Sequence, residues 1–263
     1  MAESSDKQQG AAAGGARAKP GVASLKVKFG ERTVPFQCFD TNLGRTVNGE
    51  ILAGQIYRWP DGIAPPKVIV DIGANVGAAA LYFALNFPAA KIFAFEPAPE
   101  CQPLLRENLK DFPNARIEPY GLFDRNLRRR LFVGAQDAVT NSLGQSAYNT
   151  EAGPEVELKH AAEALFALKL TGMDCLKLDT EGSEVPILEA LAPLVTETAV
   201  VFVEYHSEGD RRRIDLLLAG THLLVGARVM GPHRGELTYA RRDSYKDAKR
   251  RDRDLIRPPG RGT

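Results

Sequence analysis

Acidic residues and one histidine stand directly after apolar runs that are typical of buried β-strands. They are Asp71, Glu96, Asp179, Glu181 and His206. In open α/β sheets the ligand lies outside the carboxyl ends of the strands, so we expect these side chains to converge on one site. Charged groups at the ends of apolar strands are costly unless they are paired or used. A purely structural cluster of ion pairs is the alternative interpretation.

The stretch from residue 67 to residue 96 is expected to form a strand, a glycine turn, a helix and a second strand. Gly73 and Gly77 permit a sharp turn and a close approach of the backbone to a ligand. A dinucleotide-binding turn carries a further central glycine and cradles a diphosphate. Here that glycine is absent and Asp71 precedes the turn, which disfavours a phosphate and suits an ammonium or sulfonium group. These features predict S-adenosylmethionine (SAM) as the cofactor, the alternative being an ordinary strand-to-helix turn.

The acidic residue after the second strand is placed to bind a nucleoside. Glu96 can accept hydrogen bonds from both ribose hydroxyls, as the acidic residue does in related nucleotide-binding folds. Gly121 and Leu122 follow a third expected strand, where such folds meet the adenine ring. The residues predicted to bind the cofactor are therefore Asp71, Gly73, Gly77, Glu96, Gly121 and Leu122.

Three further residues could activate an acceptor. Methyl transfer to a hydroxyl requires in-line alignment and the removal of one proton. His206 is the one histidine at an expected strand end, and its ordinary pKa of about 6.5 suits a general base. Asp179 and Glu181 could orient that base, hold the hydroxyl or, with Glu204, ligate a divalent metal. A metal is possible but not predicted, because nothing in the spacing demands one.

The segment after the fourth expected strand, residues 179–184, reads DTEGSE. Enzymes that methylate amino groups of bases or glutamine generally carry an Asn/Asp-Pro-Pro-Tyr sequence there. Its absence favours an oxygen acceptor.

The bulk composition excludes several classes of protein. The chain has 263 residues, 44% of them hydrophobic and 25% charged, with a net charge of +1. That balance is typical of a globular protein and argues against a dedicated nucleic-acid binder. Cys38, Cys101 and Cys175 are widely spaced and indicate neither a disulfide framework nor a zinc site. No apolar run suggests a membrane span, and the first twenty residues do not read as a secretory signal, so a cytoplasmic location is predicted.

Apolar strand segments alternate with helical segments through the chain. This order predicts an α/β fold with a doubly wound, mostly parallel sheet and helices on both faces. The polar stretch from Gly134 to Gly153 shows no periodicity and is interpreted as part of the acceptor site or as disordered. The expected divisions are a flexible segment (1–22), a hairpin and helix that cover the site (23–62), the nucleoside-binding domain (63–240) and a basic, disordered tail (241–263).

Four motifs together resemble the FkbM-type methyltransferases. They are VIVDIGANVG (68–77), FEP (95–97), LKLDTEGSE (176–184) and EYH (204–206), in the order in which that family carries them. The resemblance implies a SAM-dependent O-methyltransferase of the class I Rossmann-like fold. The implied acceptors are hydroxyls of sugars, glycolipids, polysaccharides or secondary metabolites. It also implies cofactor contacts from Asp71, Gly73, Asn75, Gly77 and Glu96.

Two other functions are alternatives to an enzyme that methylates a small-molecule or glycan hydroxyl. A SAM-binding module without catalysis could dock on RNA or a protein through the basic tail, although nucleic acid is not the expected partner. An NAD-dependent oxidoreductase conflicts with the missing glycine and the acidic turn. The acceptor, the metal dependence and the oligomeric state stay open at this level.

Overall fold

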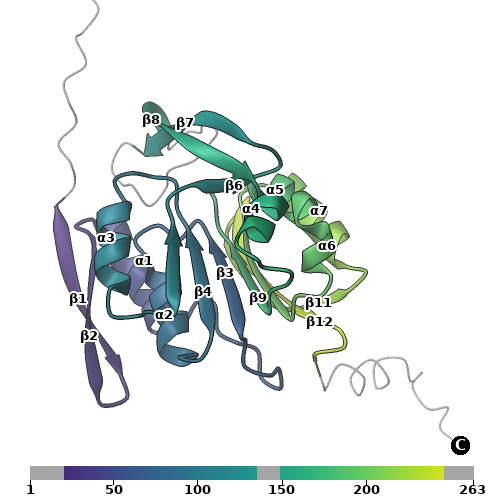
Figure 1. Ribbon diagram of the computed structural model, residues 1–263, viewed down its shortest axis with the longest axis horizontal. Coiled ribbons are helices and arrows are strands. Elements are labelled where there is room, and N and C mark those ends of the chain that lie inside the picture. Colours follow the sequence, from purple (N-terminus) through teal and green to yellow (C-terminus); the bar gives the residue numbers. More distant parts are fainter. Residues whose placement is uncertain (1–20, 135–148, 246–263) are drawn as a thin grey trace, which may run out of the picture.

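The computed structural model describes residues 21–134 and 149–245. Its centre is a seven-stranded sheet in the order β11-β12-β10-β9-β3-β4-β5 (Figure 1). The run from β5 through β4, β3 and β9 to β10 is parallel, and β12 is antiparallel to both of its neighbours. This confirms the predicted doubly wound, mostly parallel sheet. The strands are β3 Val68–Ile72, β4 Lys91–Phe95, β5 Ala115–Glu118, β9 Cys175–Leu178, β10 Val200–Tyr205, β11 His222–Gly231 and β12 Arg234–Arg241.

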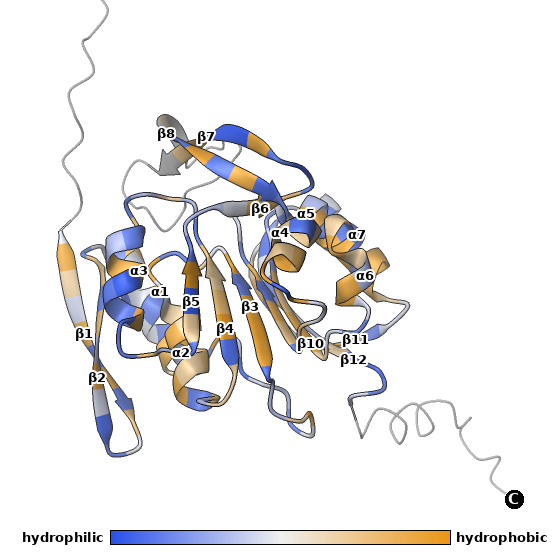
Figure 2. Cartoon of the chain, viewed as in Figure 1, coloured by the Kyte–Doolittle hydropathy of each residue, from blue (hydrophilic) through white to orange (hydrophobic). Residues whose placement is uncertain are grey.

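The central strands are apolar on both faces. Successive residues of β3 point in opposite directions, so Ile69 packs into one hydrophobic cluster and Val70 into another. Both side chains are fully buried. Strands of a parallel sheet that is covered on both sides must be apolar throughout, and Figure 2 shows orange, hydrophobic strands at the centre.

Helices cover both faces of this sheet, as predicted. The first cluster packs α1 Asn42–Leu52, α2 Ala78–Asn86 and α3 Gln102–Leu109 against the sheet. The second packs α4 Ala161–Ala167, α5 Glu184–Ala190, α6 Ala192–Val195 and α7 Glu208–Leu218 against the opposite face. Helices α5 and α6 are separate, because Pro193 has no N–H to donate to the carbonyl group four residues earlier.

The N-terminal hairpin forms a sheet of its own. β1 Val22–Phe29 pairs antiparallel with β2 Arg32–Phe39, which confirms the predicted hairpin. Asn108 of α3 accepts a hydrogen bond from the Gln37 N–H at 2.7 Å and donates one to the Gln37 carbonyl at 2.8 Å. These two bonds tie the hairpin to the helical layer.

A third, three-stranded sheet in the order β6-β8-β7 lies beyond the carboxyl ends of β3 and β4 (Figure 1). It consists of β6 Gly121–Phe123, β7 Leu127–Gly134 and β8 Asn149–His160. The expected aperiodic stretch up to Gly153 was wrong in part, because β8 begins at Asn149. Gly153 and Pro154 hide the strand in the sequence, whereas Val156 and Leu158 alternate inward and are buried. The rest of that stretch, residues 135–148, lies outside the described residues, as do residues 1–20 and 246–263 of the predicted flexible ends.

Among the described residues, no helix has both the length and the apolar composition that crossing a membrane requires.

Candidate active site

A pocket lies at the carboxyl ends of β3, β4 and β9, and it encloses about 120 Å³ of space. This is the point at which the strand order reverses, where α/β sheets bind their ligands. Leu131 and Leu158 of the three-stranded sheet line it from above, and Val47 and Ile51 of α1 line it from the N-terminal side. The predicted cover is therefore part of the pocket wall.

The predicted cofactor residues after β3 and β4 line this pocket together. Gly73, Asn75 and Glu96 are in its wall, and so are Gly121 and Leu122 of β6. Gly73 and Asn75 both have a positive φ, 80° and 51°. The sharp turn expected from the glycines is thus present.

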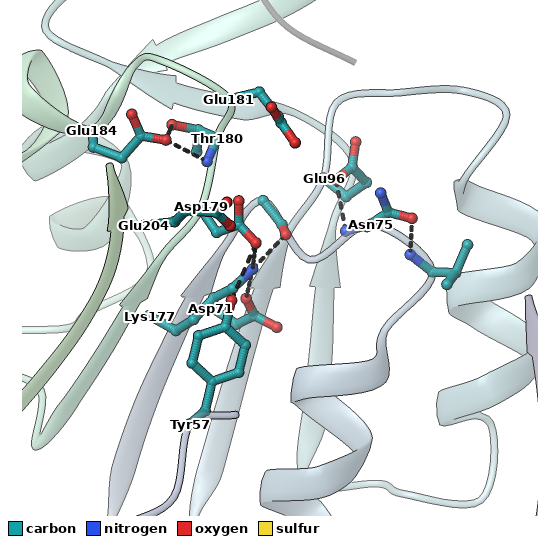
Figure 3. A network of polar contacts seen from close by, with 12 residues as sticks. Tyr57, Asp71, Asn75, Glu96, Lys177, Asp179, Thr180, Glu181, Glu184 and Glu204 are labelled. Carbon is teal, nitrogen blue, oxygen red and sulfur yellow. Dashed lines mark hydrogen bonds and ion pairs between the residues drawn. The ribbon is translucent and has the colours of Figure 1, made fainter. Parts of the chain in front are cut away.

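Glu96 is held in place by backbone groups (Figure 3). Its two carboxylate oxygens accept hydrogen bonds from the Asn75 N–H at 2.7 Å and the Ala98 N–H at 2.8 Å. The residue is only 6% exposed. Burial outweighs these two hydrogen bonds and raises the pKa of Glu96 to about 7. An acceptor of fixed orientation therefore stands at the end of β4, where the ribose of a nucleoside is expected.

Gly77 serves packing rather than the pocket wall. It caps α2 with a φ of 92° and is not among the lining residues. A Cβ at this position would lie 2.8 Å from Leu105 Cδ1 of α3. The absence of a side chain lets α2 and α3 pack closely, which corrects the expectation that Gly77 approaches the ligand.

Asp71 also differs from expectation. It lies inside β3, is fully buried and does not line the pocket. Its Oδ1 atom lies 3.1 Å from Nζ of Lys177, a residue of β9 that is equally buried. Burial raises the pKa of Asp71, and Lys177 opposes that rise. The carboxylate thus neutralises a buried lysine and is not part of the pocket wall.

Lys177 joins the glycine turn to the end of β9. Its Nζ donates a hydrogen bond to the Gly73 carbonyl at 2.6 Å and lies 3.8 Å from Asp179 Oδ2. Asp179 lines the pocket and also accepts a hydrogen bond from the Tyr57 hydroxyl at 3.1 Å. Burial alone would raise the pKa of Asp179, but Lys177 and His206 outweigh it and keep that pKa below its usual value. Asp179 is therefore an ionised acceptor on the pocket wall.

His206 lies among carboxylates. Its Nε2 atom is 3.2 Å from Glu181 and 3.5 Å from Glu204, and its Nδ1 atom is 3.5 Å from Glu184. Burial alone would lower the pKa of His206, but Glu181 and Glu184 outweigh it and raise that pKa to about 11. The histidine is therefore protonated at neutral pH. This corrects the expectation that its ordinary pKa lets it accept a proton.

Arg234 of β12 closes the same cluster. It pairs with Glu204 and lies 3.3 Å from Glu181, and all three residues line the pocket. Burial and the charge of Asp179 raise the pKa of Glu204 well above its usual value. The pocket wall thus places the carboxyl groups of Asp179, Glu181 and Glu204 beside two cations, Lys177 and Arg234, so it can both accept and donate hydrogen bonds.

Three side chains of the cluster have the ligand types and spacing of a cation site. One atom each of Asp179, Glu181 and His206 lies within 4.8 Å of the other two. The set differs from the one considered from the sequence, because Glu204 is replaced by His206. In the structure, Glu181 is already paired with His206 and Arg234, and Asp179 Oδ2 lies 3.8 Å from Lys177 Nζ.

Three residues of the site, Lys177, Glu184 and Arg234, were not singled out from the sequence. Glu184 is buried and accepts hydrogen bonds from the Thr180 N–H at 2.8 Å and the Gly182 N–H at 3.1 Å, which shapes the segment after β9. Lys177 interrupts an otherwise apolar strand, and this charged residue in a buried run was the signal by which the sequence could have indicated it. Arg234 comes from β12, far away in the chain, and carried no local signal.

Comparison with known proteins identifies the family and three relatives. The profile of the Methyltransferase FkbM domain matches residues 71–224. The 2-O-methyltransferase NoeI of Sinorhizobium fredii is 26% identical over 158 residues, which cover 55% of this chain and 65% of that protein. The Methyltransferase sdnD of Sordaria araneosa is 28% identical over 185 residues, which cover 57% of this chain and 71% of that protein.

The third relative is the Hexuronic acid methyltransferase AglP of Haloferax volcanii. It is 25% identical over 157 residues, which cover 59% of this chain and 63% of that protein. The chain therefore spans less than two thirds of the length of NoeI and of AglP.

Proposed function

The chain belongs to the FkbM methyltransferase family, and from this premise we propose that it transfers a methyl group from SAM to an oxygen atom of a sugar or another small molecule. The observation that carries the proposal is the shared pocket wall of Glu96 and Asp179. One carboxylate suits a ribose, and the other is ionised and suits an acceptor hydroxyl. The name of NoeI, a 2-O-methyltransferase, supports an oxygen acceptor, and the name of AglP, a hexuronic acid methyltransferase, supports a sugar acid.

The lining of the pocket fits SAM. Glu96 offers a buried carboxylate to the ribose hydroxyls, and Gly121 and Leu122 offer a small, largely apolar surface to the adenine ring. Gly73 and Asn75 bring backbone close to the ligand. Asp71 and Gly77 act behind this surface, one by neutralising Lys177 and the other by allowing α2 to pack.

The acceptor is assigned to the wall formed by Asp179, Glu181 and Arg234. SAM, when bound, supplies the electrophilic methyl group. Asp179 holds the acceptor hydroxyl and takes its proton on a carboxylate oxygen, because it is the ionised acceptor on this wall. Glu181 accepts a hydrogen bond from a second hydroxyl group of the acceptor. Protonated His206 pairs with Glu181 and holds its carboxylate in position. His206 is thus assigned a positioning role and Asp179 the role of base.

The test is a methyl-transfer assay with labelled SAM, the full chain and a panel of sugars with free hydroxyls or uronic carboxyl groups. We expect a labelled product that Asp179→Asn reduces by roughly 100-fold or more, with SAM affinity retained. Mild alkaline treatment of the product identifies the acceptor atom, because it releases methyl esters and leaves methyl ethers intact.

Two outcomes would contradict the proposal. SAM binding without transfer to any oxygen acceptor would favour a module that binds the cofactor without catalysis. Full activity of Asp179→Asn would assign the base to another residue.

A further inference from the structure

Tyr57 reaches the site from the connection between α1 and β3 and precedes the segment that the family profile matches. Its φ is 59°, which is uncommon for an aromatic residue. The ring packs edge-on against Phe202 with centroids 5.6 Å apart and lies 6.5 Å from the ring of Phe83. A strained backbone persists only where the surroundings determine it, and such positions concentrate at functional sites.

The hydroxyl of Tyr57 is not needed to fill this aromatic cluster, because a phenylalanine ring would occupy the same space. It donates instead to Asp179 Oδ2 at 3.1 Å (Figure 3). Burial and the charge of Asp179 raise the pKa of Tyr57 well above its usual value, so the phenol keeps its proton and remains a donor. Tyr57 does not line the pocket and therefore can act on an acceptor only through Asp179.

We propose that Tyr57 is a positioning residue for methyl transfer, whose hydroxyl orients Asp179 toward the acceptor and stabilises its ionised form. The inference rests on the proposed function of Asp179 as the base. It makes the N-terminal cover a working part of the site, because the cover supplies a hydrogen bond to the reactive carboxylate.

Several charged groups influence the pKa of Asp179, and the hydrogen bond from Tyr57 acts in addition to them. Those facing it are Lys177 of β9, Glu204 and His206 at the end of β10, Arg234 and Glu236 on β12, and Asp71 on β3. A hydrogen bond donated to the charged form of a carboxylate lowers its pKa. Loss of the Tyr57 hydroxyl should therefore raise the pKa of Asp179.

The matched variants are Tyr57→Phe and Tyr82→Phe. Both remove one hydroxyl group and leave the ring, and Tyr82 belongs to the same aromatic cluster, with its ring centroid 5.6 Å from that of Phe83. Tyr82 is not a lining residue of the pocket. We expect both proteins to fold, because the ring packing is preserved.

The primary measurement is the carboxyl ¹³C resonance of Asp179, assigned with Asp179→Asn and followed against pH. We expect Tyr57→Phe to raise the pKa of Asp179 by about one pH unit, since one hydrogen bond to a charged group is involved. Tyr82→Phe should leave it unchanged. An unchanged pKa in Tyr57→Phe would overturn the proposal, and this readout needs no acceptor, so it is independent of the proposed reaction.

Turnover supplies the second readout once an acceptor is known. The acidic limb of the kcat profile should move to higher pH in Tyr57→Phe, with the Kd for SAM unchanged. If Tyr57→Phe does not fold, the reciprocal experiment uses Asp179→Asn, in which the pKa of the Tyr57 phenol should fall. A phenol that titrates identically in that variant would contradict the coupling.

Discussion

A Cβ atom on Gly73 would lie 1.8 Å from the carbonyl oxygen of Asp179. The glycine turn after β3 and the segment after β9 are therefore in direct backbone contact, although more than one hundred residues separate them in the sequence. This contact lets Lys177 bond the Gly73 carbonyl and approach the Asp179 carboxylate at the same time. The cofactor half and the acceptor half of the pocket therefore meet at the backbone contact between Gly73 and Asp179, which we call the junction.

Gly73→Ala should disrupt both halves. The methyl group cannot be accommodated without moving the backbone after β9, so we expect loss of SAM binding and a clear loss of stability. Gly62→Ala is the matched control, because Gly62 has a φ of 85° and nothing lies within 4 Å of its missing Cβ. The control should cost about 1–2 kcal/mol, which is the cost of placing a side chain in the left-handed conformation. Equal effects in urea denaturation would show that the junction tolerates the methyl group.

Glu96 should make SAM binding depend on pH. The pKa of Glu96 is raised to about 7, and the ionised form is the better acceptor for ribose hydroxyls. Affinity should therefore strengthen by about tenfold from pH 6 to pH 8 and level off above that range. Calorimetric titration with SAM measures this trend. The Glu96→Gln variant should bind SAM weakly, with an affinity that does not change with pH. A flat profile in the wild-type protein would contradict ribose binding by this carboxylate.

Lys177→Met should destabilise the fold by about 3–5 kcal/mol, because it leaves the buried carboxylate of Asp71 without its partner. Adding Asp71→Asn to the same chain removes the orphaned charge and should recover part of that loss. Lys110→Met is the control, since Lys110 pairs with Glu107 on the exposed surface and such pairs contribute little. Urea denaturation measures all three variants. Strictly additive effects of the two core substitutions would mean that the pair is not coupled.

His206 should make stability fall as pH rises above neutrality. Its pKa is about 11 in the folded protein and lower in the unfolded chain, so its stabilising contribution is full below about pH 6.5 and is lost toward pH 11. His206→Asn should flatten the fall in Tm between pH 7 and pH 10. His222→Asn is the control, because burial lowers the pKa of that histidine and places its titration below this window. An identical slope in His206→Asn and wild type would contradict the ion-pair assignment.

Much of the fold was accessible from local pattern. Val68 to Val70 are apolar without interruption, as a doubly covered strand must be, and Gly73 marks the turn that follows it. The same rule identified β4, β9 and β10. It failed at β8, because Gly153 and Pro154 discourage a strand that is nevertheless held by pairing with β6 and β7.

Candidate site residues divide in the same way. Glu96, Asp179 and Glu181 were placed at strand ends by pattern, and they line the pocket. Asp71 was expected at the mouth of the pocket, but it is fully buried inside the sheet.

The sequence by itself determined the strand and helix order, the glycine turn and the acidic residues at the strand ends, because these depend on neighbours along the chain. Only the tertiary structure decided which of those charges are paired, which stay ionised and which face the pocket. Lys177 neutralises Asp71, Glu181 keeps His206 protonated, and Tyr57 bonds Asp179. Each of these outcomes depends on burial and on a partner from a different element, and no local pattern carries that information.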